Sequence, residues 1–296
     1  MLSLDEAYDR ATRDAVQIRH PETLRLIRLT GPQRVWFLQN TVTADVEGVP
    51  DGRWVESCFL DPKGRIQAHF RIGFLGDEVW LDVEPDAATN LAEWFTRYRF
   101  RTKVEIETVQ KPCVTVLGPG AVAHAGPGEI TSSIAFGFRV GDVSATDIHA
   151  DAELDLPAAP EELYDVLRVE AGIGAFGIDY DTRSLPQEAG LTRVVSVEKG
   201  CYVGQETVAR IHFRGHINKV LRPLSFDSEV STGAEVRWEG DNVGDVTSVA
   251  FSPRRGHVGI GMIRVEPPEG ACLEVEGGGT AELGPLPEGT KVKAPG

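Results

Sequence analysis

The chain has 296 residues, of which 41% are hydrophobic and 25% charged, as in ordinary globular proteins, and this length accommodates one to three domains. The acidic first residues do not resemble a secretion signal, and no run of about eighteen apolar residues occurs, so we expect a cytoplasmic protein without a membrane span. A net charge of −15 repels phosphate backbones and argues against broad nucleic-acid binding.

The first hundred residues predict a two-layer α+β unit with helices on one face of an antiparallel sheet. Ser3 and Glu6 form a capping box that begins a helix. Strands are predicted where apolar and polar residues alternate, and helices where apolar residues recur every three or four positions. The predicted elements are strands over 24–29, 66–74, 79–83 and 104–106, and helices from residue 4, from residue 35 and from Pro85. His69 falls on the polar face of its strand.

The composition changes twice in the rest of the chain. Residues 108–160 are rich in Gly and Pro and then in acids, which predicts a small separate lobe or an insertion. Beyond residue 216, short strands separated by Gly, Asn, Ser and Pro predict a small antiparallel barrel or sandwich. These strands cover 221–226, 234–238, 244–250 and 258–265. The last twenty residues predict an ordered edge followed by a loose tail.

A helix predicted from Pro160 places a carboxylate, Glu170, on the same face as three apolar side chains. Burying a carboxylate without a partner costs several kcal/mol. Glu170 is therefore expected to meet a partner or a ligand, or to have a raised pKa. The alternative is that the helix has ended by Glu170, because two glycines follow closely.

The four cysteines are far apart and form no C-x-x-C pair, which argues against a zinc cage or a redox dithiol. In a reducing cytosol we expect free thiols. Cys58, Cys113 and Cys272 have strand-like neighbours and are predicted to fill core. Cys201 differs from them because it lies in a polar stretch with glycines on both sides.

The stretch from Lys199 to Gly215 combines an ammonium, a thiol, a phenol, a carboxamide, a carboxylate and two guanidinium groups, spaced by three glycines. A loop that only connects strands needs no such set, so we predict a functional loop. Basic residues also outnumber acids here, which indicates either an anionic ligand or a solvated face. The five basic residues between 199 and 222 are Lys199, Arg210, Arg214, Lys219 and Arg222.

The octet K-G-C-Y-V-G-Q-E at 199–206, followed by V-A-R at 208–210 and F-R-G at 213–215, closely resembles the signature of the YgfZ-type folate-binding proteins. These proteins are relatives of the aminomethyltransferase, or T-protein, of the glycine cleavage system. Other landmarks of that superfamily follow the same order over nearly the whole chain. They are Gly31, F-L-Q at 37–39, T-A-D at 43–45, D-P-K-G-R at 61–65, E-A-G at 170–172 and G-D-V-T-S at 244–248.

The resemblance implies an α+β fold of three domains in a ring, with ferredoxin-like α/β lobes, a C-terminal antiparallel β-barrel and a central channel for tetrahydrofolate. The first domain would be split into residues 1–107 and 161–215, with residues 108–160 inserted as a small domain. The barrel would cover residues 216–296. The changes of composition near 108, 160 and 216 agree with this plan.

The resemblance also implies how tetrahydrofolate would bind. Glu170 matches the superfamily glutamate that accepts two parallel hydrogen bonds from the pterin. Tyr164 matches an aromatic residue that flanks the ligand, although helix packing would equally explain it. The other candidates for cofactor binding are Gln205 of the octet and, for the anionic glutamyl tail, Arg210, Arg214 and Lys199.

Cys201 and Lys199 are the candidate catalytic residues. A basic neighbour and a polar loop would lower the pKa of the Cys201 thiol and leave its sulfur reachable. The thiolate could act as a nucleophile, a transient iron ligand or a redox sensor, and the sequence leaves these open. The chain lacks the ligand spacing of a stable cluster, so no metal site is predicted.

The aspartate pair that serves methylene transfer in the aminomethyltransferases is replaced by Ala68 and His69, so glycine cleavage activity is not expected. The leading hypothesis is a tetrahydrofolate-binding accessory protein in iron–sulfur cluster assembly or repair, which supports iron–sulfur enzymes including tRNA-modifying ones. Its partners would be folate and iron–sulfur enzymes or assembly factors. The alternatives are a folate-dependent transferase of aminomethyl or other one-carbon groups and a non-enzymatic docking scaffold.

Overall fold

A computed structural model describes residues 1–215 and 217–290, apart from the side chains of residues 21–24 and 214. No helix in these ranges is long and apolar enough to cross a membrane. The chain forms two compact units. The first contains Met1–Pro62, Ile66–Leu163 and Val194–Val203, and the second contains Lys63–Arg65, Tyr164–Arg193 and Gly204–Gly296.

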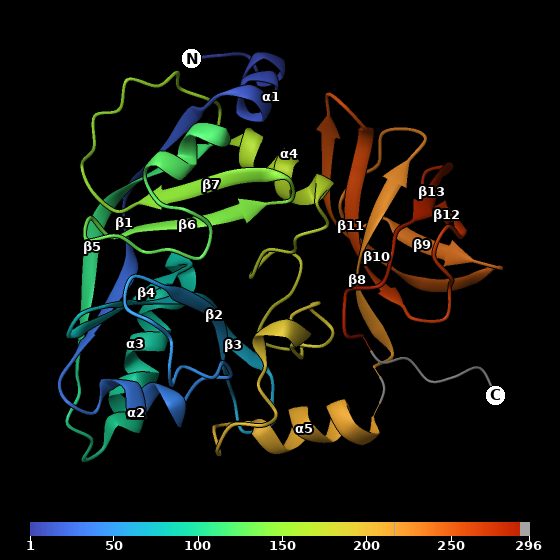
Figure 1. The fold of residues 1–296 in the computed structure, drawn as a ribbon. Coiled ribbons are helices and arrows are strands. Elements are labelled where there is room, and N and C mark those ends of the chain that lie inside the picture. The colour runs from blue at the N-terminus through green and yellow to red at the C-terminus, as the bar shows by residue number, and fades with distance from the viewer. Residues whose placement is uncertain (216, 291–296) are drawn as a thin grey trace. The chain divides into compact units, whose positions relative to one another are not determined.

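The first unit is built on a seven-stranded antiparallel sheet with the strand order β2-β3-β4-β1-β5-β7-β6 (Figure 1). The strands are β1 (Val16–Thr30), β2 (Trp54–Leu60), β3 (Ile66–Leu75), β4 (Glu78–Val83), β5 (Glu105–Leu117), β6 (Ala135–Val140) and β7 (Val143–Ile148). The strands predicted in the first hundred residues are confirmed, and β1 and β5 are longer than expected. Because β7 pairs with β5, the segment 108–160 continues the same sheet, and its description as a separate domain stays a prediction.

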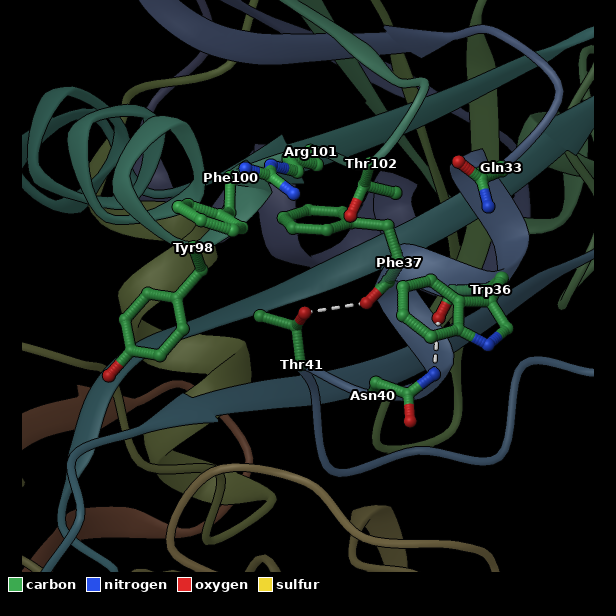
Figure 2. A pocket seen from close by; sticks show the side chains of 9 residues that line it. All are labelled: Gln33, Trp36, Phe37, Asn40, Thr41, Tyr98, Phe100, Arg101 and Thr102. Carbon is green, nitrogen blue, oxygen red and sulfur yellow. Dashed lines mark hydrogen bonds between the residues drawn. The ribbon is translucent and has the colours of Figure 1, made fainter.

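The helices of the first unit are α1 (Leu4–Arg13), α2 (Arg34–Gln39), α3 (Pro85–Arg99) and the 3₁₀ turn η1 (Pro119–Ala123). Aromatic contacts join α2 and α3 to each other and α3 to the sheet. The ring of Phe95 in α3 meets Phe37 of α2 and Phe59 of β2 edge to face, with centroids 5.3 and 5.7 Å apart. The three predicted helices are thereby confirmed, including the capping box at Ser3. The turn that follows α3 and the helix α2 border a pocket (Figure 2).

Four charged side chains from four strands meet within this sheet. Arg71 Nη1 lies 3.0 Å from Asp82 Oδ2 and 2.8 Å from Asp147 Oδ2. Arg25 Nη2 lies 3.3 Å from Asp82 Oδ1 and 3.8 Å from Asp147 Oδ2. His149 is fully buried, with its Nε2 3.4 Å from Asp82 Oδ1. The sequence analysis did not predict this network.

The buried arginines control the ionisation of both carboxyls in the network. Burial raises the pKa of Asp82, but Arg25, His149 and Arg71 outweigh it and hold that pKa well below its usual range. Burial likewise raises the pKa of Asp147, and Arg71 and Arg25 again hold the net pKa below its usual value. Both aspartates are therefore ionised at neutral pH, and the network is a buried set of paired charges.

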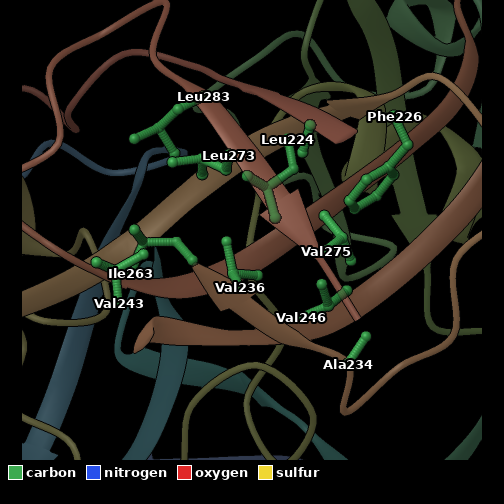
Figure 3. Packing of buried hydrophobic residues seen from close by; sticks show 11 residues of the cluster. Leu224, Phe226, Ala234, Val236, Val243, Val246, Ile263, Leu273, Val275 and Leu283 are labelled. Atoms are coloured by element: carbon green, nitrogen blue, oxygen red, sulfur yellow. The ribbon is translucent and has the colours of Figure 1, made fainter. Parts of the chain in front are cut away.

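The second unit contains a closed antiparallel barrel with the strand order β10-β11-β8-β13-β12-β9 (Figure 1). The strands are β8 (Lys219–Phe226), β9 (Glu235–Trp238), β10 (Asp241–Ser252), β11 (Gly256–Arg264), β12 (Cys272–Val275) and β13 (Gly279–Leu283). Buried aliphatic side chains such as Val236, Ile263 and Leu273 fill its interior (Figure 3). The predicted barrel and its four predicted strands are confirmed.

The C-terminal strands correct two expectations. β13 pairs with β8 on one side and β12 on the other, so it is an interior strand of the barrel and not an edge. Cys272 in β12 is exposed and does not fill core, whereas Cys58 and Cys113 are buried as predicted. The predicted loose tail over 291–296 lies outside the described residues.

Three short helices complete the chain, namely α4 (Glu162–Glu170), η2 (Thr192–Val194) and α5 (Gln205–Arg214). α5 corrects the description of 199–215 as a loop, because ten of these residues form a helix. Gly204 precedes the helix with φ +80°, a conformation that favours glycine. Gly64, in the turn before β3, lies against α5, where an added Cβ would come within 3.0 Å of Thr207.

Candidate functional site

The segment that leads to Lys199 is fastened to the sheet of the first unit by Thr43. This fully buried residue donates its backbone N–H to Cys58 O at 2.9 Å and its hydroxyl to Val194 O at 2.8 Å. Its carbonyl accepts the Ser196 N–H at 2.9 Å. The T-A-D landmark at 43–45 therefore supports the neighbouring part of the signature.

Lys199 joins the signature to the turn that follows α2. Its ammonium donates to Gln39 O at 2.8 Å, to Val42 O at 2.6 Å and to Ala44 O at 2.6 Å. The same group lies 4.8 Å from the ring centroid of Tyr202. Three carbonyls match the three N–H donors of an ammonium. Lys199 thus has a positioning role in this structure, and its catalytic role stays a prediction.

Burial lowers the pKa of Lys199 to about 8, and the carboxylates of Asp45 and Glu47 act in the opposite direction. At neutral pH the side chain is still mostly protonated, so it can donate to all three carbonyls. Burial also raises the pKa of Tyr202 to about 12. Its phenol remains protonated and donates to Ser196 O at 2.9 Å.

Cys201 lies between these two anchored residues, and its side chain is exposed. Lys199 and Tyr202 fix the chain on either side of this exposed residue. Cys113 is buried, and burial raises the pKa of its own thiol. The exposed setting of Cys201 makes its sulfur available to a partner or a ligand.

In the second unit, a buried ion pair holds the end of α4. Arg168 Nη1 lies 2.8 Å from Asp179 Oδ2, and both side chains are almost completely buried. Arg168 Nη2 also donates to Ser248 Oγ at 3.2 Å, and the Thr247 hydroxyl donates to Asp179 Oδ1 at 2.5 Å. The G-D-V-T-S landmark at 244–248 therefore binds this ion pair on the side of β10.

The helix α4 ends at Glu170, and the Glu170 carboxylate has hydrogen-bond and ion-pair partners. The sequence analysis gave an ended helix and a partnered carboxylate as alternatives, and both are observed. Ser252 Oγ donates to Glu170 Oε2 at 2.9 Å, and Arg255 Nε lies 3.1 Å from Glu170 Oε1. The side chain is 11% exposed.

Apart from Lys199, the other predicted cofactor residues also belong to the second unit. Tyr164 is half-buried on α4, and Gln205 and Arg210 lie on α5, where Arg210 is exposed. The side chain of Arg214 lies outside the described part of the chain. Lys199 and Cys201 belong to the first unit.

The five basic residues between 199 and 222 are only partly available for an anionic ligand. Arg222 is 1% exposed and donates from Nη1 to Pro267 O at 2.7 Å and from Nε to Gly284 O at 3.0 Å. Lys199 is directed at backbone carbonyls. Arg210 and Lys219 are exposed and remain available for an anionic ligand.

His69 has a carboxylate partner that the sequence did not reveal. Its Nε2 lies 2.8 Å from Glu56 Oε1 on the paired strand β2, and the His69 side chain is 18% exposed. Ala68, next to it, is buried. A histidine oriented by a carboxylate is a common arrangement for proton transfer.

The comparisons with known proteins agree with the sequence signature. No protein-family model matches the chain. The sequence is similar to the tRNA-modifying protein YgfZ of Yersinia enterocolitica, with 27% identity over 73% of this chain and 74% of the relative. It is also similar to a mitochondrial iron–sulfur cluster assembly factor IBA57 homolog of Pyricularia oryzae, with 25% identity over 82% of this chain and 70% of the relative.

The fold matches a solved structure of the aminomethyltransferase superfamily. The crystal structure of glycine cleavage system aminomethyltransferase T from Bartonella henselae superposes with a TM-score of 0.86 and 20% sequence identity, covering 99% of this chain and 91% of that chain. The chain therefore has a fold of this superfamily, and the predicted resemblance to YgfZ-type proteins is confirmed. The three-domain ring and its central folate channel stay predictions.

Proposed function

We propose that this protein is a tetrahydrofolate-binding accessory factor that supports iron–sulfur enzymes, including tRNA-modifying ones, through the thiol of Cys201. The observation that carries the proposal is the exposed Cys201 held between the anchored Lys199 and Tyr202. The similarity to relatives called tRNA-modifying protein YgfZ and iron–sulfur cluster assembly factor supports the same process.

Glu170 is the residue that would hold the pterin. It is a nearly buried carboxylate, and a carboxylate can accept two parallel hydrogen bonds from the paired N–H donors of a pterin ring. The exposed guanidinium of Arg210 would attract the anionic glutamyl tail. Tetrahydrofolate, when bound, supplies amines that carry one-carbon groups. In this chain, Glu170 would recognise the pterin ring and Cys201 would provide a thiol.

The role of the thiol is tested by Cys201→Ser, with Cys272→Ser as the matched control because both cysteines are exposed. The alleles replace the gene in its own host, and iron–sulfur dehydratase activity and modified tRNA nucleosides are measured. We expect Cys201→Ser to match the deletion and Cys272→Ser to match wild type. If Cys201→Ser retains full activity, the thiol has no role and the docking-scaffold alternative is favoured.

A one-carbon transferase is the second candidate, and the contact between His69 and Glu56 favours it. The pair could move a proton although the aspartates of the aminomethyltransferases are missing. Purified protein is assayed for transfer from an aminomethyl donor to saturating tetrahydrofolate. Turnover that disappears in His69→Gln would establish this function, and the absence of turnover would exclude it for that donor.

A further inference from the structure

A pocket of about 420 Å³ lies between α2 and the turn after α3, and its walls are aromatic (Figure 2). Trp36 stands on one side, and Tyr98 and Phe100 stand on the other. These side chains are 54%, 38% and 85% exposed, respectively. Exposed large apolar side chains that gather around a hollow indicate a binding surface.

Phe100 has a backbone conformation that its side chain disfavours. The Thr102 N–H donates to Arg99 O at 2.8 Å, which closes a four-residue turn. Phe100 is the second residue of this turn, with φ 44° and ψ −104°, where glycine is strongly preferred. Holding another residue there costs about 1–3 kcal/mol. Because the ring is mostly exposed, folding gains little from it in return.

The two walls of the pocket are fixed to each other. Gln33 Oε1 accepts the Lys103 N–H at 2.7 Å, and the Gln33 N–H donates to Lys103 O at 3.1 Å. Within the wall formed by α2, Asn40 Nδ2 donates to Trp36 O at 2.7 Å (Figure 2). The pocket therefore exists before a ligand arrives, which lowers the entropic cost of binding.

A segment that contributes to the pocket wall is basic, although the protein as a whole is acidic. Residues 97–103 read R-Y-R-F-R-T-K, with four basic residues and no acid, whereas the net charge of the chain is −15. Arg101 lines the pocket, and its guanidinium lies 5.4 Å from the ring centroid of Phe100. Arg97 and Lys103 are also exposed. This local positive charge complements a partner with carboxylates.

We propose that the pocket docks a short segment of a partner protein that carries an aromatic or large aliphatic anchor side chain beside carboxylates. Trp, Tyr and Arg are the residue types that dominate the binding energy of protein interfaces. Small molecules are usually enclosed over most of their surface, which walls exposed by up to 85% do not provide. Single-stranded nucleic acid would require a longer basic track for its phosphates. Neither Glu170 nor Cys201 lines this pocket.

The proposal is tested by fluorescence anisotropy with a fluorescein-labelled peptide that has a central Phe between Asp and Glu residues. Two comparison peptides carry Lys in place of the acids or Gly in place of Phe, and an oligo(U) probe represents RNA. We expect the acidic Phe peptide to bind, and both comparison peptides to bind at least about tenfold more weakly. Failure to bind, equal binding of all three peptides, or preferential binding of oligo(U) would overturn the proposal.

Single-residue variants test whether the peptide binds at this pocket. Trp36→Ala and Arg101→Glu should weaken peptide binding by at least about tenfold, and Phe251→Ala, at an exposed aromatic of the barrel, should leave it unchanged. Phe100→Gly is informative because it removes the ring and relieves the turn. We expect it to raise the melting temperature and to weaken binding, which separates a lost contact from a lost fold. Unchanged affinity in Trp36→Ala and Arg101→Glu would contradict the proposal.

Discussion

Replacing Asp147 by Ala should lower the free energy of unfolding by about 3–5 kcal/mol. Asp147 accepts from Arg71 Nη1 at 2.8 Å and from the Thr115 hydroxyl at 2.5 Å, and it is 3% exposed. Its removal leaves two mostly buried guanidinium groups, 14% and 17% exposed, with one carboxylate, Asp82, between them. The uncompensated positive charge lowers the free energy of unfolding more than the loss of the Asp147 contacts does. Urea unfolding followed by circular dichroism measures it.

Asp151→Ala is the matched control, because Asp151 follows β7 closely and is exposed. Its free energy of unfolding should stay within about 0.5 kcal/mol of wild type. An equally small effect of Asp147→Ala would show that the network does not stabilise the sheet.

The same network predicts how stability depends on pH. The pKa values of Asp82 and Asp147 are depressed in the folded state, so the unfolded chain binds more protons in acid. The stabilisation is complete above pH ~4, the usual aspartate pKa, and is lost as the pH falls towards the folded values. Wild type should therefore lose more stability than Asp147→Ala between about pH 5 and pH 3. Equal slopes for the two proteins would contradict the predicted shift.

Replacing Arg168 by Met should destabilise the second unit by about 3–5 kcal/mol. Met has a similar length but no charge, so Asp179, which is 4% exposed, loses its ion-pair partner. Because Arg168 holds the end of α4, its loss also releases Glu170 two residues later. We expect both a lower melting temperature and weaker binding of tetrahydrofolate.

Arg237→Met provides the control within the same unit. Arg237 forms a 3.0 Å ion pair with Glu235 in which both side chains are about half exposed, and such surface pairs contribute about 0–1 kcal/mol. Similar unfolding curves for Arg168→Met and Arg237→Met would refute the structural role of the buried pair.

The alternation of apolar and polar residues in strands and the helical spacing of apolar residues predicted most of the fold correctly. Each pattern marks the face of a strand or helix that must be buried. Strand β3 illustrates this, since its burial alternates residue by residue over most of its length. β12 and β13 were not recognised as barrel strands. They have four and five residues in a segment rich in Gly and Glu, and closure of the barrel supplies the pairing that stabilises them. A strand that depends on such distant pairing shows no recognisable strand pattern in its own sequence.

The candidate site was predicted less completely. The signature located Cys201, but it did not show that Lys199 would be directed at three carbonyls after α2, because those partners are about 155–160 residues away in the chain. Arg168 and Asp179 lie only 11 residues apart and were also missed, and Ser248 and Thr247, which bind them, are 80 and 68 residues away in the chain. Asp82 had a usable signal, since it is a lone acid in the apolar strand V-W-L-D-V. A charge in such a strand predicts a buried partner.

The central claim, that this protein binds tetrahydrofolate through Glu170, is tested most directly by calorimetric titration of tetrahydrofolate into wild type, Glu170→Gln and Glu162→Gln. Glu162 is an exposed residue of the same helix and serves as the control. We predict saturable binding to wild type and Glu162→Gln, with affinity reduced about 10–100-fold in Glu170→Gln through loss of charge-assisted hydrogen bonds. No binding to wild type, or undiminished binding to Glu170→Gln, would contradict the claim.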